Sequence, residues 1–136
     1  MIRLTPILIA PTSQVYMVEI GENLVRPFCA NAQGLPKVSV SFNVVNQQFI
    51  GTTQTAVTVD ASVSVIYRPA GSTASVVRQF NEQFTVGFTG TAGKVPAITF
   101  GLGTPNAVAA DNVKCGGRAY GIRTFVPLSI NAAFPA

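Results

Sequence analysis

The sequence predicts an all-β fold, an antiparallel two-layer β-sandwich of jelly-roll-like or Ig-like type. First, apolar and polar residues alternate with a period of two over long segments, which gives a strand one buried and one solvated face. Second, glycine- and proline-containing turn sequences separate these segments. Third, apolar residues do not recur at the spacing of an amphipathic helix over any useful length.

The predicted strands follow one another at regular intervals, and the alternation is clearest in the middle of the chain, between residues 37 and 89. Gly21-Glu22-Asn23 is predicted to be a turn, and Ala107–Asp111 a single helical turn within the irregular stretch 101–117. The predicted strands are residues 15–20, 24–29, 37–49, 54–67, 75–89, 95–100, 118–126 and 128–131.

We expect one domain, residues 1–136, with extended arms at both ends of a sandwich formed by residues 14–130. The N-terminal arm, residues 1–13, is apolar but contains Pro6 and Pro11, and a proline cannot donate to the ladder of a central strand. The C-terminal tail is residues 131–136. Each arm either docks on its own domain or adds to the sheet edge of a neighbour, with Ile7, Leu8 and Ile9 as candidate interface residues.

The composition favours a subunit whose apolar surface is covered by other subunits. Only 10% of residues are charged, and the mean hydropathy of +0.40 is high for a soluble monomer. No run of about 18 apolar residues exists, so no membrane span is expected. The net charge is +4, but the basic residues are scattered, and nucleic acid is therefore not an expected partner.

The chain start is not a usable signal peptide, because its apolar run is short and is bracketed by Pro6 and Pro11. A charge-poor β-protein without an export signal is expected in a particle that leaves the cell by lysis, the virion, and an extracellular location is the alternative. In this general character the whole chain resembles decoration, capsid-associated and tail proteins of tailed bacterial viruses. The resemblance implies a structural role and assigns no function to individual residues.

The residues that carry catalysis or bind metals are scarce. Histidine is absent, so the usual general base and the partner of a serine or cysteine nucleophile are missing. Two distant cysteines do not make a zinc site. We therefore expect no enzyme activity, metal, cofactor or small-molecule substrate. Cys29 and Cys115 form either one disulfide or two buried thiols.

Arginine is followed two positions later by an aromatic residue in four places, and on a strand such residues share a face. Three interpretations remain open: arginine stems that cover core rings, a subunit interface, or a platform for single-stranded nucleic acid. The second interpretation adds candidate interface residues at the chain's C-terminal end, namely Arg118, Tyr120, Arg123 and Phe125.

Together these observations predict a non-enzymatic structural subunit of a virus particle, a capsid, decoration or tail component, whose partners are identical subunits and other virion proteins. The alternative is an extracellular carbohydrate- or receptor-binding module. That alternative requires exposed aromatic side chains, and Tyr16, Tyr67 and Tyr120 are its candidates. A single-stranded nucleic-acid binder is the third hypothesis.

Overall fold

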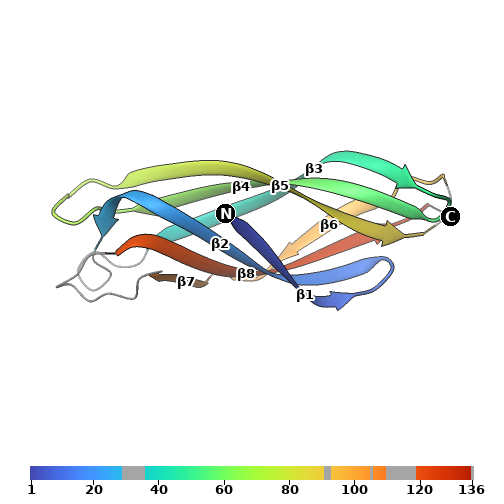
Figure 1. Cartoon of the computed structure of the whole chain (residues 1–136), viewed down its shortest axis with the longest axis horizontal. Helices are drawn as coiled ribbons and strands as arrows, with labels where there is room; N and C mark the ends of the chain where they lie inside the picture. Colours follow the sequence, from blue (N-terminus) through green and yellow to red (C-terminus); the bar gives the residue numbers. More distant parts are fainter. Residues whose placement is uncertain (29–35, 91–92, 105, 110–118, 136) are drawn as a thin grey trace.

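A computed structural model describes residues 1–28, 36–90, 93–104, 106–109 and 119–135, and these residues form two antiparallel sheets (Figure 1). The described residues contain strands and no helix, which confirms the all-β prediction. The strands are β1 (Ile2–Ile9), β2 (Ser13–Phe28), β3 (Lys37–Ile50), β4 (Gln54–Tyr67), β5 (Val76–Thr89), β6 (Ala97–Leu102), β7 (Asn106–Ala109) and β8 (Ala119–Ala133).

The first sheet has the order β1-β2-β8-β6, and β7 pairs with β8 on the same side as β6. The second sheet is a simple meander, β3-β4-β5. The two sheets lie face to face as long, gently twisted layers (Figure 1). No helix in the described part of the chain is long and apolar enough to cross a membrane.

Two predicted strand boundaries are wrong, because pairing with distant strands overrides the local sequence. Gly21-Glu22-Asn23 continues β2 rather than turning, since each of its residues pairs with β8. The predicted strands 118–126 and 128–131 are one strand, β8, which runs through Pro127. Residues 106–109 form β7 and not a helical turn.

Pro127 fits inside β8 because the neighbouring edge is interrupted beside it. Its carbonyl oxygen accepts a hydrogen bond of 2.9 Å from the Gly103 N–H, so the N–H that proline lacks would point to the same side. On that side β6 has ended at Leu102 and β7 has not begun. A Cβ on Gly103 would lie 2.8 Å from Cγ of Pro127, so the glycine permits this close approach.

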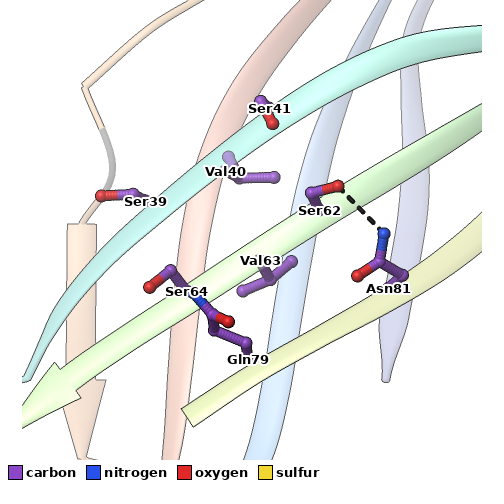
Figure 2. Close-up of a pocket in the computed structure, with 8 residues that line it drawn as sticks. All are labelled: Ser39, Val40, Ser41, Ser62, Val63, Ser64, Gln79 and Asn81. Carbon is purple, nitrogen blue, oxygen red and sulfur yellow. Dashed lines mark hydrogen bonds between the residues drawn. The ribbon is translucent and has the colours of Figure 1, made fainter. Parts of the chain in front are cut away.

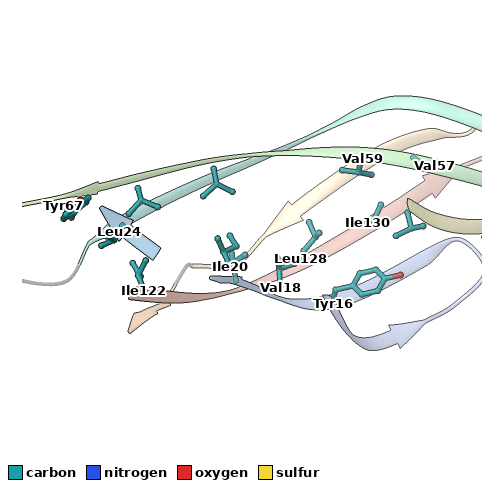
Figure 3. Packing of buried hydrophobic residues seen from close by; sticks show 14 of the residues in the cluster. Tyr16, Val18, Ile20, Leu24, Val57, Val59, Tyr67, Ile122, Leu128 and Ile130 are labelled. Atoms are coloured by element: carbon teal, nitrogen blue, oxygen red, sulfur yellow. The ribbon is translucent and has the colours of Figure 1, made fainter. Parts of the chain in front are cut away.

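The core lies between the two sheets and follows the alternation of the sequence. Along β4 the odd-numbered residues from Val57 to Tyr67 are all buried, and the even-numbered residues face outward. The first sheet contributes Val18, Ile20, Leu128 and Ile130 to the same cluster (Figure 3). Burial of these aliphatic side chains is the main favourable term in the stability of such a fold.

Both segments that were predicted to be arms contain residues that form strands in the first sheet of this domain. Ile2–Ile9 forms β1, which pairs antiparallel with Gln14–Ile20 and has a register shift between Pro6 and Leu8. At the other end, residues 131–133 complete β8, and Ala132 donates its N–H to the carbonyl oxygen of Thr12 over 2.9 Å. These strand residues therefore dock on the chain's own domain, which is one of the two alternatives expected for the arms.

Candidate interaction surface

The two-layer stack has two lateral sides that differ in chemistry. On one, which we call the clasped side, the edge strand β5 faces β1 and β2. On the other, which we call the open side, the edge strand β3 faces β6, and the rings of Phe42 and Phe100 lie 5.9 Å apart. Since sheet edges carry unpaired backbone groups, both sides are places where another chain could pair.

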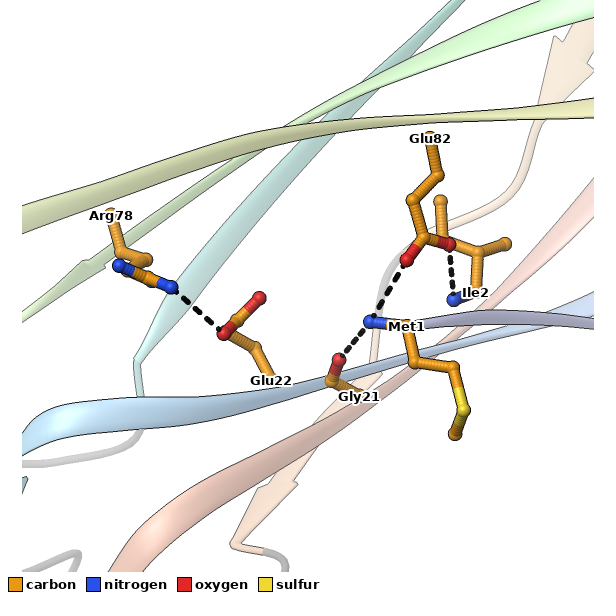
Figure 4. Close-up of polar contacts among 6 residues, drawn as sticks. All are labelled: Met1, Ile2, Gly21, Glu22, Arg78 and Glu82. Atoms are coloured by element: carbon orange, nitrogen blue, oxygen red, sulfur yellow. Dashed lines mark hydrogen bonds and ion pairs between the residues drawn. The ribbon is translucent and has the colours of Figure 1, made fainter.

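Polar contacts join the two sheets along the clasped side (Figure 4). The α-ammonium group of Met1 lies 3.3 Å from Oε1 of Glu82 and donates a 2.6 Å hydrogen bond to the carbonyl oxygen of Gly21. The backbone N–H of Ile2 donates to Oε2 of Glu82 over 2.6 Å. Further along, Nη2 of Arg78 lies 3.4 Å from Oε1 of Glu22. Glu82 and Arg78 on β5 thus meet groups of β1 and β2.

These contacts cap the outer edge of β1. Met1 and Gly21 exchange both backbone hydrogen bonds, so the N–H groups of Ile2 and Leu4 point away from β2. The carboxylate of Glu82 accepts a hydrogen bond from the N–H of Ile2. Pro6, the next residue after Leu4 whose backbone faces away from β2, has no N–H. Only the N–H of Leu4 is left for an added strand along this stretch, and an irregular register follows it. Inward-pointing charges, prolines and bulges are devices that prevent edge pairing.

On the open side the longer strand, β3, has no proline and no inward-pointing charge, and its one irregularity is a register shift between Val44 and Asn46. From Val38 to Ile50, β3 contains no charged residue, no proline and no glycine. Lys37, at the start of the strand, is its single charged residue. Uncharged segments rich in β-forming residues readily pair with another strand. The side chains of Val45, Phe49 and Ile50 are 48%, 47% and 54% exposed, which is high for apolar residues on one strand.

Contacts between the layers on the open side are mainly apolar. Phe42 meets Phe100 of the other layer and, within its own sheet, the ring of Phe84 on β5, at 6.0 Å in an edge-to-face arrangement. Gln47 donates a 3.4 Å hydrogen bond to the carbonyl oxygen of Pro96, while its buried Oε1 has no hydrogen-bond partner in the described part of the chain. No ion pair between described residues joins β3 to β6.

The outer face of the β3-β4-β5 sheet carries a shallow hollow of about 390 Å³ (Figure 2). At its edge the side-chain amide of Asn81 donates to Oγ of Ser62 and to Oδ2 of Asp60, both over 3.0 Å. The serine hydroxyls and the side-chain amide of Gln79 that line the hollow can hydrogen-bond a polar ligand. Among the described residues no three His, Cys, Asp or Glu side chains gather to hold a metal ion. The polar residues that line the hollow are Ser39, Ser41, Ser62, Ser64, Gln79 and Asn81.

The predicted interface residues that the structure describes lie on different parts of the first sheet. Ile7, Leu8 and Ile9 are exposed at the end of β1, beyond the capped stretch. Arg123 and Phe125 lie on the outer face of the first sheet, where Nε of Arg123 is 3.6 Å from Oε1 of Glu19. In the register, Leu8 is level with Ser129 and not with Phe125. Cys29, Cys115 and Arg118 lie outside the described residues, as does the side chain of Tyr120.

Two of the three tyrosines proposed as an exposed binding face are buried, so that prediction is wrong for them. Tyr16 is 8% exposed and Tyr67 is 5% exposed. Their burial could have been predicted from the alternation along the strands, because Tyr16 lies on the same face as Val18, and Tyr67 on the same face as Val65. The sequence reasoning also missed the uncharged run in β3 and the role of Glu82.

A buried polar chain links the two sheets near Tyr16. Its hydroxyl donates to Oε1 of Gln14, and the Gln14 side-chain amide donates to the carbonyl oxygen of Gly87 on β5. Burial raises the pKa of the Tyr16 hydroxyl above its usual value of 10.0, because the phenolate would lose its hydration. The neutral, donating form of Tyr16 is therefore the one that fits the fold.

This raised pKa predicts a loss of stability in alkali. The unfolded chain releases the Tyr16 proton at lower pH than the folded chain, so the contribution is complete below about pH 10 and is lost above it. We expect Tyr16→Phe to cost about 1 kcal/mol at pH 7, since Oε1 of Gln14 loses its donor, and to flatten the alkaline decline. Urea unfolding between pH 7 and 11 measures this, and parallel curves for the two proteins would contradict it.

The comparisons with known proteins provide no relative. No protein-family model matches the chain, and neither a curated protein nor a solved structure shows significant similarity to it. Function is therefore inferred from the chain's own residues.

Proposed function

We propose that this protein is a non-enzymatic structural subunit of a virus particle, a capsid, decoration or tail component of a tailed bacterial virus. It assembles with identical subunits and other virion proteins, and its two sheets form a jelly-roll-like or Ig-like sandwich. One observation carries the proposal: the chain caps the β1 edge on one lateral side, and on the other it leaves a strand that is uncharged from Val38 to Ile50 and has exposed apolar residues.

This difference between the sides directs association. A β-protein that remains a monomer protects its edges, whereas an assembly subunit keeps at least one edge available. Phe49 and Ile50 are about half exposed at the end of β3, where contact with another subunit would remove them from water. The small charged fraction of 10% leaves little repulsion to oppose such contact.

The polar hollow on the outer face supports a carbohydrate- or receptor-binding module as the second candidate. Its hydroxyl and amide groups suit a neutral polar ligand, but Tyr16 and Tyr67 are not available to stack on a sugar ring. The nucleic-acid hypothesis is weakened because Arg78 and Arg123 are each paired with a glutamate. The structural subunit remains the better supported proposal.

Light scattering over a concentration series, with electron microscopy of the concentrated samples, tests the proposal. We expect masses that are multiples of 14.2 kDa and rise with concentration, together with regular rings, tubes or shells. The double variant Phe49→Gln/Ile50→Thr should shift association to at least about tenfold higher concentration, because it removes apolar surface from the open side.

The matched control changes residues that are slightly more exposed and lie on the edge strand of the other sheet, in the variant Ile7→Gln/Ile9→Thr, which we expect to associate like the wild type. A wild-type chain that stays at 14.2 kDa at every concentration and forms no regular structure would contradict the proposal. Loss of association in the control alone would move the contact to the end of β1, as the arm hypothesis predicts.

A further inference from the structure

We propose that the partner at the open side is a second copy of this chain, and that β3 pairs antiparallel with β3 of that copy about a two-fold axis at Ser41. The inference rests on the proposed function, because it names the partner of the same open side. It is carried by the register, the alternation and the charge distribution of β3.

The first half of β3 offers a regular edge. Residues from Lys37 to Val44 pair without interruption with Ile66 to Val59 of β4, and the register shifts only between Val44 and Asn46. Among the described strands, β3 pairs with β4 alone, so no described strand lies beside its other edge. Eight consecutive residues in regular register can therefore accept a neighbouring strand.

The alternation of this segment is complementary to itself. An antiparallel pair centred on Ser41 places Val40 opposite Phe42, and Val38 opposite Val44, in both halves of the dimer. Ser39 faces Asn43 on the outer side. Each apolar residue of the inner face thus meets an apolar residue, and each polar residue of the outer face meets a polar one. The shared core continues from one copy into the next.

The single charge on β3 selects the antiparallel orientation. With the axis at Ser41, Lys37 lies opposite Val45 of the other copy, and the two lysines are at opposite ends of the pair. A parallel pair in register would place the two lysines side by side, which is unfavourable. Sliding the antiparallel pair toward the start of β3 would also bring them together. A two-fold axis makes the contact closed, so it yields a dimer rather than a fibre.

The clasped side then limits the growth of the paired sheets. The dimer would contain one continuous sheet of order β5-β4-β3-β3-β4-β5, with β5 of each copy at the outer ends. There Glu82 and Arg78 are engaged with β1 and β2, so the charges of each β5 lie at the margin of the dimer. Charged edge strands resist further pairing. The dimer is thus a finite building block.

Disulfide cross-linking tests the pairing. In a chain with Cys29 and Cys115 changed to serine, Ser41→Cys should give a covalent dimer as the main species after mild oxidation. Directly opposed residues of antiparallel strands have Cα atoms about 4.5–5.5 Å apart, a separation that suits a disulfide. Gln79→Cys is the matched control, because Gln79 is exposed on the same outer face but lies on β5, at the other edge of the sheet. We expect it to remain monomeric on a non-reducing gel.

A second variant needs no change of the native cysteines. Ser41→Lys places two ammonium groups at the axis and should weaken the dimer at least about tenfold, whereas Gln79→Lys should leave its mass unchanged. Both positions are exposed, so both variants should keep the wild-type circular dichroism spectrum. If the chain without cysteines does not fold, the masses of these two variants still test whether β3 pairs with β3 of a second copy.

The results separate this inference from the function on which it rests. Oligomers that persist in Ser41→Lys, with no cross-link through Ser41→Cys, would overturn the β3 pairing and leave the assembly role standing. A wild-type chain that is monomeric at every concentration would overturn both. A cross-link through Ser41→Cys with a weakened Ser41→Lys dimer is the result that we expect.

Discussion

Replacing Leu128 with alanine should lower the free energy of unfolding by about 2–5 kcal/mol, the range for truncating a buried leucine. Leu128 is fully buried on β8, an inner strand of its sheet, within the cluster that contains Val59 and Ile130 (Figure 3). The change removes apolar contacts and leaves a cavity that rigid strands on both layers cannot close. A domain of ordinary stability, about 5–15 kcal/mol, would lose a large share of it.

Leu102 provides the matched control for this prediction. It is the register partner of Leu128 on β6 and the same residue type, but it is 46% exposed. Leu102→Ala should cost less than about 1 kcal/mol, because water already reaches much of its side chain. Urea unfolding followed by circular dichroism measures both losses. Equal losses would mean that the core does not lie between the two sheets at Leu128.

The middle of the fold could be predicted from the sequence because its sheet has one buried and one solvated face. The strands expected at 37–49, 54–67 and 75–89 agree with β3, β4 and β5 to within one residue at each end. Most of their apolar residues face the other sheet, with exposed exceptions such as Val45, Ile66 and Val77, so the period of two persists over long segments. Each connection within this sheet is a local turn, and local turns leave signals in the sequence.

The first sheet was less predictable because distant partners decide its course. Gly21-Glu22-Asn23 has turn-forming composition, yet β8 pairs with it from about a hundred residues away. Pro127 reads as a strand end, and it is tolerated only because Gly103 passes beside it between two short strands. Neither partner can be identified from the sequence around these residues, since pairing of remote strands is a tertiary effect.

The candidate surface could be predicted only in part, since its meaning depends on strand order. The uncharged run from Val38 to Ile50 is visible in the sequence, but the same run would suit an inner strand covered on both sides. Likewise Glu82 reads as an ordinary exposed acid. The fold brings its carboxylate to the Ile2 N–H, which is eighty residues away in the sequence. Edge and partner are properties of the folded sheet.

Changing Gln14 to glutamate should cost about 3–5 kcal/mol at pH 7, the penalty for an uncompensated buried charge. Gln14 is only 3% exposed and uses both ends of its side chain, accepting from Tyr16 and donating to the carbonyl oxygen of Gly87. An ionised glutamate still accepts from Tyr16, but it has no donor for Gly87. Instead it places a negative charge against that carbonyl oxygen, inside the contact between β2 and β5.

The pH dependence of this variant identifies the cause of the loss. A protonated glutamate regains a donor for Gly87, so the fold favours the neutral acid and raises the pKa of the new carboxyl group above its ordinary value of about 4.3. Stability is then retained below about pH 4.3 and lost as the pH rises, so the penalty relative to wild type should be smaller at pH 4 than at pH 7. Gln79→Glu, at an exposed position on β5, should show a small change at both values. Urea unfolding of the three proteins at each pH makes the comparison. If Gln14→Glu lowers the free energy of unfolding equally at pH 4 and pH 7, altered packing and not buried charge weakens the contact between the sheets.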